Sequence, residues 1–148
     1  MGRDRGPYGR AVLSGLGSIE QLVALEEIRA LQARYCIYLD KKRWTDLAGL
    51  FAPDARLELN DRADSPTTPE GIVRFIENSL AVLQTSHHST CSDIELIDDD
   101  HAHGVWEALY VTEGNPICFG FYENDFRRVD GSWKIQLMRR IKRFTNSS

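Results

Sequence analysis

Apolar residues recur three or four positions apart over residues 22–39, which is the spacing of one face of an α-helix. These positions are Leu22, Leu25, Ile28, Leu31, Tyr35 and Leu39. Ser18, followed three residues later by Gln21, forms a capping-box pattern at the start of the run. The pattern therefore predicts one long helix in the first third of the chain.

Two shorter helices and a strand are predicted next. A helix from Trp44 to Phe51 is expected to end before Pro53, because proline cannot continue the helical hydrogen-bond ladder. Residues 55–59 alternate between apolar and polar side chains, as a half-buried strand does. Thr68 and Pro69 then supply a cap and a first-turn proline for a third helix.

From Ser86 onward the pattern changes to the alternation of β-strands, in four consecutive runs. The breaks between runs fall at residues 98–100, 114–116 and 130–131. Asp130-Gly131 is the clearest hairpin signal, because a tight turn needs a positive φ, which glycine adopts at little steric cost.

Three helices before an antiparallel meander indicate an α+β fold. We expect a cone-shaped barrel in which the N-terminal helices pack on a curved, mostly antiparallel sheet. Because helices do not fill the whole concave face of such a sheet, a mostly apolar pocket for a small molecule is expected inside it.

Composition limits the functional classes. The chain has 148 residues, 42% of them hydrophobic, and a formal charge of -4, as expected for one soluble domain with no nucleic-acid partner. Residues 1–15 are expected to be a mobile tail and residues 16–148 a single domain. No run approaches the ~18 apolar residues of a membrane span, and no secretory signal is visible, so we expect a cytoplasmic protein.

The spacing of the three cysteines and of two later histidines does not indicate a metal site. Cys36, Cys91 and Cys118 lie far apart without CxxC spacing, which fits neither a disulfide framework nor a zinc site. His101 and His103 lack further ligands at useful spacing and are expected to face solvent.

Several short motifs occur in a recognisable order. They are Ile28-x-x-Leu31-x-x-Arg34-Tyr35 leading to Asp40, Trp44-x-x-Leu47-x-x-Leu50-Phe51-x-x-Asp54-Ala55, His88, Gly104-Val105-Trp106, Gly120-x-Tyr122 and Arg128-Val129-Asp130-Gly131-x-Trp133-Lys134-Ile135. Together they resemble the SnoaL-like branch of the nuclear-transport-factor-two-like superfamily, particularly its members similar to scytalone dehydratase and bile acid dehydratase.

The resemblance implies a frequently dimeric cone with a buried pocket and usually no metal or organic cofactor. Family members include dehydratases, isomerases, polyketide cyclases and hydrolases. Dehydratase-like members use a tyrosine and an aspartate at the end of the first helix and a histidine on a strand. This implies Tyr35, Asp40 and His88 as catalytic residues.

These three residue types suit acid–base chemistry. Imidazole is the best base near neutral pH, a carboxylate can orient it, and a phenol can polarise a substrate oxygen. His87 and His88 fall on opposite faces of a strand, so only one can face inward, and we assign that place to His88. Tyr35 and Asp40 can face one pocket only if the first helix ends near Leu39.

Other side chains are expected to contact the substrate, although the sequence does not decide which face of each strand points inward. They are Trp44, Trp106, Tyr110, Phe121, Tyr122 and Arg139. Tyr110 occupies a position where relatives often have an acidic residue. Arg140, adjacent to Arg139, leaves the choice of arginine open.

The predicted function is a cofactor-independent lyase or isomerase with dehydratase-like acid–base chemistry on a hydrophobic, oxygenated small molecule. A polyketide cyclase or hydrolase would use the same pocket. A non-catalytic dimer that binds a small molecule is the third alternative. We expect a homodimer that uses the outer sheet face, with Val105, Leu109 and Val111.

Overall fold

The computed structural model describes residues 19–60 and 65–146, so the predicted tail and the Ser18 cap lie outside the described residues. The helices are α2 (Ile19–Asp40), α3 (Trp44–Ala48) and α4 (Pro69–Leu80). The strands are β1 (Phe51–Leu59), β2 (Thr85–Leu96), β3 (His101–Thr112), β4 (Cys118–Val129) and β5 (Ser132–Thr145).

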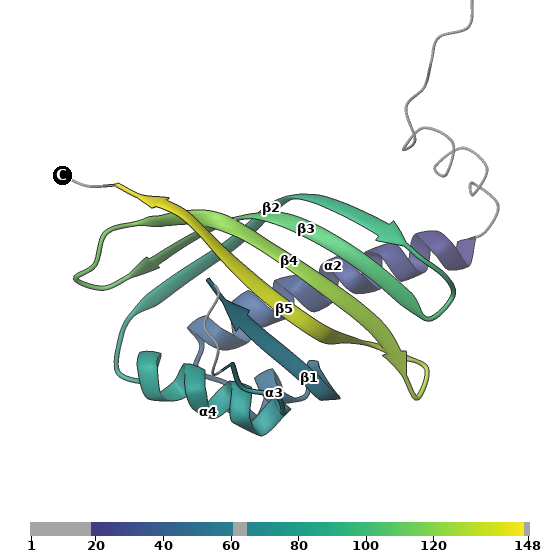
Figure 1. Ribbon diagram of the computed structural model, residues 1–148, viewed down its shortest axis with the longest axis horizontal. Helices are drawn as coiled ribbons and strands as arrows, with labels where there is room; N and C mark the ends of the chain where they lie inside the picture. Colours follow the sequence, from purple (N-terminus) through teal and green to yellow (C-terminus); the bar gives the residue numbers. More distant parts are fainter. Residues whose placement is uncertain (1–18, 61–64, 147–148) are drawn as a thin grey trace, which may run out of the picture.

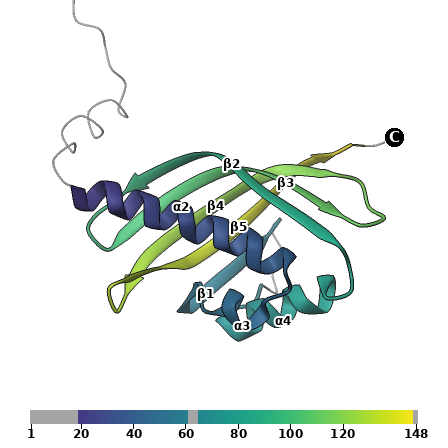
Figure 2. The same ribbon diagram turned by 180° about the vertical axis from the view of Figure 1, so that it is seen from behind.

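The five strands form one curved sheet in the order β1-β5-β4-β3-β2. Neighbouring strands are antiparallel except β1 and β5, which are parallel. Helix α2 crosses the inner face of the sheet, while α3 and α4 lie side by side near β1 (Figures 1 and 2). This arrangement confirms the predicted α+β cone.

The helix ends are fixed by local chemistry. Helix α2 stops at Asp40, because Lys42 adopts a φ of 57° and the Arg43 N–H donates to the Tyr38 carbonyl at 2.8 Å. At the start of α4 the Thr68 hydroxyl accepts a hydrogen bond from the Gly71 N–H at 3.1 Å, as the sequence predicts. The predicted hairpin turn at residues 130–131 is also confirmed, with both residues at positive φ.

The second helix is shorter than predicted. It ends at Ala48, and β1 already begins at Phe51, which pairs with Ile135 of β5. Pro53 therefore lies within a strand instead of ending a helix. Because β1 is at the edge of the sheet, the missing N–H of proline removes no hydrogen bond from an inner ladder.

β-Bulges in β2 and β5 change which side chains face the core. In β2, Cys91 has a φ of 50°, and the register shifts between Thr90 and Asp93. In β5, Ile135 and Leu137 pair with consecutive residues of β4, so Gln136 is an extra residue. Each extra residue reverses the alternation of the strand beyond it.

The inner face carries the core. It includes Ala102, Trp106, Ala108, Tyr110, Tyr122, Asn124, Phe126 and Met138, all of which are buried. Opposite them, α2 contributes a buried stripe that includes Ile28, Leu31, Tyr35 and Leu39. Within the described ranges, no helix is long and apolar enough to cross a lipid bilayer.

Gly120 provides a stability test, because a Cβ atom there would lie 1.9 Å from the Ile141 carbonyl oxygen. We expect Gly120→Ala to lower the free energy of unfolding by about 3 kcal/mol, since the backbone of β5 would have to move. Gly114→Ala is the control, because Gly114 has a φ of 75° but open space around it; there the expected loss is about 1 kcal/mol. Urea unfolding measures both values. An equal or smaller loss at Gly120 would contradict the close approach.

Candidate active site

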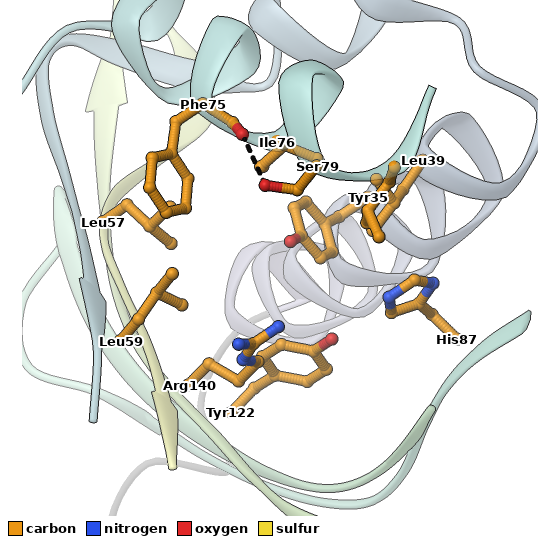
Figure 3. Close-up of a pocket in the computed structure, with 11 residues that line it drawn as sticks. Tyr35, Leu39, Leu57, Leu59, Phe75, Ile76, Ser79, His87, Tyr122 and Arg140 are labelled. Carbon is orange, nitrogen blue, oxygen red and sulfur yellow. Dashed lines mark hydrogen bonds between the residues drawn. The ribbon is translucent and has the colours of Figure 1, made fainter. Parts of the chain in front are cut away.

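A cavity of about 240 Å³ lies between α2, α4 and the inner face of the sheet. Its lining is mostly apolar, with a few polar groups that converge on the space (Figure 3). The lining residues are Tyr35, Leu39, Leu57, Leu59, Phe75, Ile76, Ser79, Leu80, His87, Tyr122 and Arg140. The cavity is slightly smaller than the roughly 300–1,000 Å³ of pockets for drug-sized ligands, which indicates a small ligand.

Asp40 and His87 form a hydrogen-bonded pair at the edge of this cavity. The Asp40 Oδ1 atom lies 2.7 Å from Nδ1 of His87, and Oδ2 accepts the His87 backbone N–H at 2.8 Å. Thr85 donates its hydroxyl to Oδ1 at 2.8 Å and accepts from Lys42 Nζ at 3.0 Å. The Asp40 carboxylate thus connects the end of α2 to the start of β2 through several hydrogen bonds.

This pairing fixes the tautomer of His87. An ionised carboxylate can only accept hydrogen bonds, so Nδ1 of His87 carries the proton. The other ring nitrogen, Nε2, then has a free lone pair, and the ring borders the cavity (Figure 3). His87 is therefore arranged as a base whose proton-accepting atom is available to a ligand.

Burial sets the protonation state of the pair. The His87 side chain is only 3% exposed. Desolvation lowers the pKa of His87 below the usual value of 6.5, and the nearby cations Arg140 and Lys42 lower this pKa further. The hydrogen bond and the negative charge of Asp40 act in the opposite direction but do not outweigh burial. The imidazole is therefore neutral, and able to accept a proton, at pH 7.

Two phenols face the same space. Tyr35 on α2 and Tyr122 on β4 point their hydroxyl groups toward the cavity, and their rings meet edge to face at 5.8 Å (Figure 3). Burial raises the pKa of both hydroxyls, so they keep their protons near neutral pH. Both can donate a hydrogen bond to an oxygen or halide of a ligand.

Arg140 supplies the positive charge of the cavity. Its guanidinium points inward from β5 and lies 5.0 Å from the ring centre of Tyr110 (Figure 3). On another side, Tyr110 stacks on His87, with ring centres 5.9 Å apart and planes at 12°. Tyr110 therefore contacts both His87 and Arg140, although it is not among the lining residues.

Residues 20–139 match the SnoaL-like domain family. The chain belongs to this family. A curated relative, hexachlorocyclohexane dehydrochlorinase 1 of Sphingobium indicum, is 25% identical over 81% of this chain and 82% of its own length. This membership confirms the resemblance found in the sequence.

Solved structures agree with the SnoaL-like fold. A candidate scytalone dehydratase from Novosphingobium aromaticivorans superposes with a TM-score of 0.78 at 22% identity, covering 86% of this chain and 89% of that protein. A type 2 hexachlorocyclohexane dehydrochlorinase (LinA) gives a TM-score of 0.78 at 24% identity, covering 86% and 90%. At these identities the structures establish the fold alone.

The SnoaL-like domain places His87 in the cavity, so the prediction that His88 faces inward is wrong. His88 is exposed, and its Nε2 atom lies 2.9 Å from the hydroxyl of Ser86. Residues 85–90 are polar on both faces of β2, so apolar alternation could not tell the two histidines apart. Tyr35 and Asp40 do lie with His87, but Asp40 stands behind the imidazole and does not line the cavity.

The late arginine is also corrected, from Arg139 to Arg140. Unbroken alternation from Trp133 and Ile135 would turn Arg139 inward. The extra residue Gln136 reverses the phase, so Arg140 enters the cavity, while Arg139 on the outer face pairs with carboxylates. No local sequence signal marks this bulge.

Only some of the predicted substrate-contacting aromatic residues lie at the cavity. Tyr122 lines the cavity, and Tyr110 supports its polar groups. Trp106 packs in the core against Phe126, Trp44 is half-buried beside Lys42, and Phe121 lies on the outer face beside Arg143, so none of these three lines the cavity. The apolar lining from β1 and α4 carries no sequence signal that separates it from ordinary core residues.

A polar seam below the cavity sets the position of α2 against the sheet. We define this seam as Gln32, Cys36, Ser89 and Asn124. The Gln32 amide donates to the Ser89 hydroxyl at 2.9 Å and accepts from the Asn124 amide at 2.8 Å, and Cys36 Sγ lies 3.2 Å from Ser89 Oγ. Gln32, Cys36 and Asp40 are four residues apart, so one face of α2 makes all these contacts.

Within the described ranges, no group of three His, Cys, Asp or Glu side chains is arranged to hold a metal ion.

The lowered pKa of His87 predicts a stability change with pH. The unfolded chain binds a proton near pH 6.5, whereas the folded protein binds it at lower pH, so this histidine's contribution to stability is present above pH 6.5. It is lost as the pH falls from 6.5 through the folded pKa. Urea unfolding between pH 7.5 and 4.5 should show a shallower loss in His87→Gln than in the wild type. His88→Gln is the control, and an identical slope in all three proteins would contradict the buried, neutral imidazole.

Proposed function

We propose that this protein is a cofactor-independent lyase or isomerase that begins its reaction by removing a proton from carbon. The observation that supports this is the Asp40–His87 pair at a mostly apolar cavity. The base there is buried, neutral, oriented by Asp40 and beside the ligand space. Fold alone would not support a reaction, because similar folds carry many chemistries.

The reaction would use His87 as the base. Its Nε2 atom takes a proton from a carbon of the substrate, and Asp40 stabilises the imidazolium that forms. In an elimination, the C–H electron pair becomes a new C=C bond as the leaving group departs with its own bonding pair. In an isomerisation, the C–H pair forms the C=C bond of an enolate while the carbonyl π pair moves onto the oxygen, and the imidazolium of His87 then returns its proton to another carbon of the conjugated system.

The remaining polar groups would act on the negative charge that develops. The hydroxyls of Tyr35 and Tyr122 donate hydrogen bonds, and Arg140 supplies a positive charge. Donors that are fixed before the reaction stabilise such charge most effectively in a site of low polarity. Tyr35 and Asp40 thus keep the roles proposed from the sequence, and His87 takes the role assigned there to His88.

The relatives support the elimination form of this reaction. The curated relative is a dehydrochlorinase, an enzyme named for removing HCl from hexachlorocyclohexane. One structural neighbour is a candidate scytalone dehydratase. Dehydrochlorination and dehydration both break a C–H bond and an adjacent bond to an electronegative atom, which is the chemistry proposed for His87.

The two neighbouring histidines give a matched test of this proposal. Candidate substrates are hexachlorocyclohexane and a panel of cyclic ketones with a β-hydroxyl or β-halogen group, incubated in D₂O. Mass spectrometry would follow both loss of the leaving group and deuterium uptake, so proton removal is detected even without elimination. We expect His87→Gln to lower the rate by at least about 100-fold, the usual contribution of a general base.

His88→Gln is the control, because His88 is exposed and its ring contacts Ser86. It should keep the wild-type rate. Equal loss in both variants, or full activity in His87→Gln, would remove His87 from the mechanism. A wild-type protein that binds panel members without proton exchange or product would favour the non-catalytic binding alternative, and ring-closed or hydrolysed products would favour the cyclase or hydrolase.

The homodimer also remains a prediction. Val105, Leu109 and Val111 lie half-buried on the outer face of the sheet, as the sequence analysis assumed. We expect sedimentation at micromolar concentration to give twice the chain mass, and Leu109→Lys to shift the protein toward monomer. A monomer in the wild type would contradict the prediction.

A further inference from the structure

The charges of the described residues around the cavity do not balance. Among these lining residues Arg140 is the cation, and none of them is Asp or Glu. Asp40 stands behind His87, where its oxygens accept hydrogen bonds from His87 and Thr85. A ligand in the cavity therefore meets a positive charge without a facing carboxylate among the described residues.

Arg140 differs in this respect from its neighbour in sequence. Arg139 lies 2.9 Å from a carboxylate oxygen of Glu58 and 3.6 Å from one of Glu123. Among the described residues, no carboxylate lies within ion-pair distance of Arg140, and its buried Nε atom has no hydrogen-bond partner. Its guanidinium lies over the face of the Tyr110 ring.

An unpaired cation in a mostly apolar cavity is unfavourable, because the surroundings replace little of the solvation it loses. The aromatic face of Tyr110 compensates only in part. A bound anion would supply the missing charge and accept hydrogen bonds in the planar geometry that guanidinium prefers. Tyr35 and Tyr122 add hydroxyl donors that face the same space.

We propose that the cavity binds a small substrate that carries a carboxylate group, with Arg140 as the residue that binds this group. The carboxylate would occupy the side of the cavity at β5, and the carbon that loses its proton would face His87. The substrate class rests on the proposed function, whereas the binding of a carboxylate does not need catalysis.

Tyr110 has a positioning role in this site. Its ring contacts both the imidazole of His87 and the guanidinium of Arg140, and it carries no negative charge that would neutralise Arg140. A carboxylate at this position would pair with Arg140 and compete with the substrate. Tyr110→Glu should therefore weaken anion binding, whereas Tyr110→Phe, which keeps the ring, should not.

Benzoate and benzamide are suitable probes, because they have nearly the same shape and differ in charge. Binding at pH 7.5 would be followed by isothermal titration and by NMR shifts of the Tyr35 and Tyr122 rings. We expect the wild type to bind benzoate at least about tenfold more tightly than benzamide, the size of effect that one charge-assisted interaction gives. Arg140→Met should remove this preference, and Arg139→Met should retain it.

Several outcomes would overturn the proposal. Equal binding of the two probes by the wild type, or an unchanged preference in Arg140→Met, would exclude Arg140 as the carboxylate site. If Arg140→Met does not fold, as judged by near-UV circular dichroism, Tyr110→Glu tests the same point, and an unchanged preference there would also count against it.

The experiment separates this proposal from the catalytic one. His87→Gln removes the proposed base but keeps Arg140, so it should bind benzoate with the wild-type preference while losing proton exchange. Carboxylate preference without any exchange activity in the wild type would overturn the proposed function and leave the binding site. If the wild type exchanges protons of neutral ketones but shows no preference for benzoate over benzamide, the carboxylate site would be overturned and the proposed function would stand.

Discussion

The position of one carboxylate determines the geometry of the site. Asp40 is the last residue of α2, and it accepts hydrogen bonds from the backbone and ring of His87 and from Thr85 on β2. The chain leaves the helix directly after Asp40, through Lys42 at positive φ. The same carboxylate therefore connects the end of α2 to β2 and orients the imidazole beside the cavity.

The polar seam extends this constraint along α2. Buried polar side chains contribute little net stability, yet each requires its partner, so they specify one alignment of helix and sheet. Gln32 bonds to the Ser89 hydroxyl and the Asn124 amide in the same position of α2 in which Asp40 reaches His87, since all these contacts come from one helix face. The apolar contacts of α2 alone would permit small shifts along the sheet.

The sequence predicts those features that local chemistry determines. The order of the elements, the Thr68 cap and the turn at residues 130–131 follow from periodicity, capping and turn preferences. The family resemblance implies Tyr35 and Asp40; Tyr35 lines the cavity and Asp40 lies behind His87, while their catalytic roles stay predictions. The inward histidine is not predictable in this way, because both faces of β2 are polar near residue 87. Neither is the inward arginine, because the bulge at Gln136 depends on how β5 pairs with β4, and the residue types around Gln136 do not mark it.

The bulge at Gln136 has a consequence for how the protein tolerates changes in length. In a regular strand, loss of one residue turns every following side chain to the opposite face. Strand β5 contains one residue more than its pairing with β4 requires at this point. A deletion of Gln136 would straighten the strand and still leave Arg140 facing the cavity, whereas a deletion within β4 between Tyr122 and Phe126 would rotate one of them out of the core. Strand β5 therefore has a built-in tolerance to a one-residue deletion that β4 lacks there.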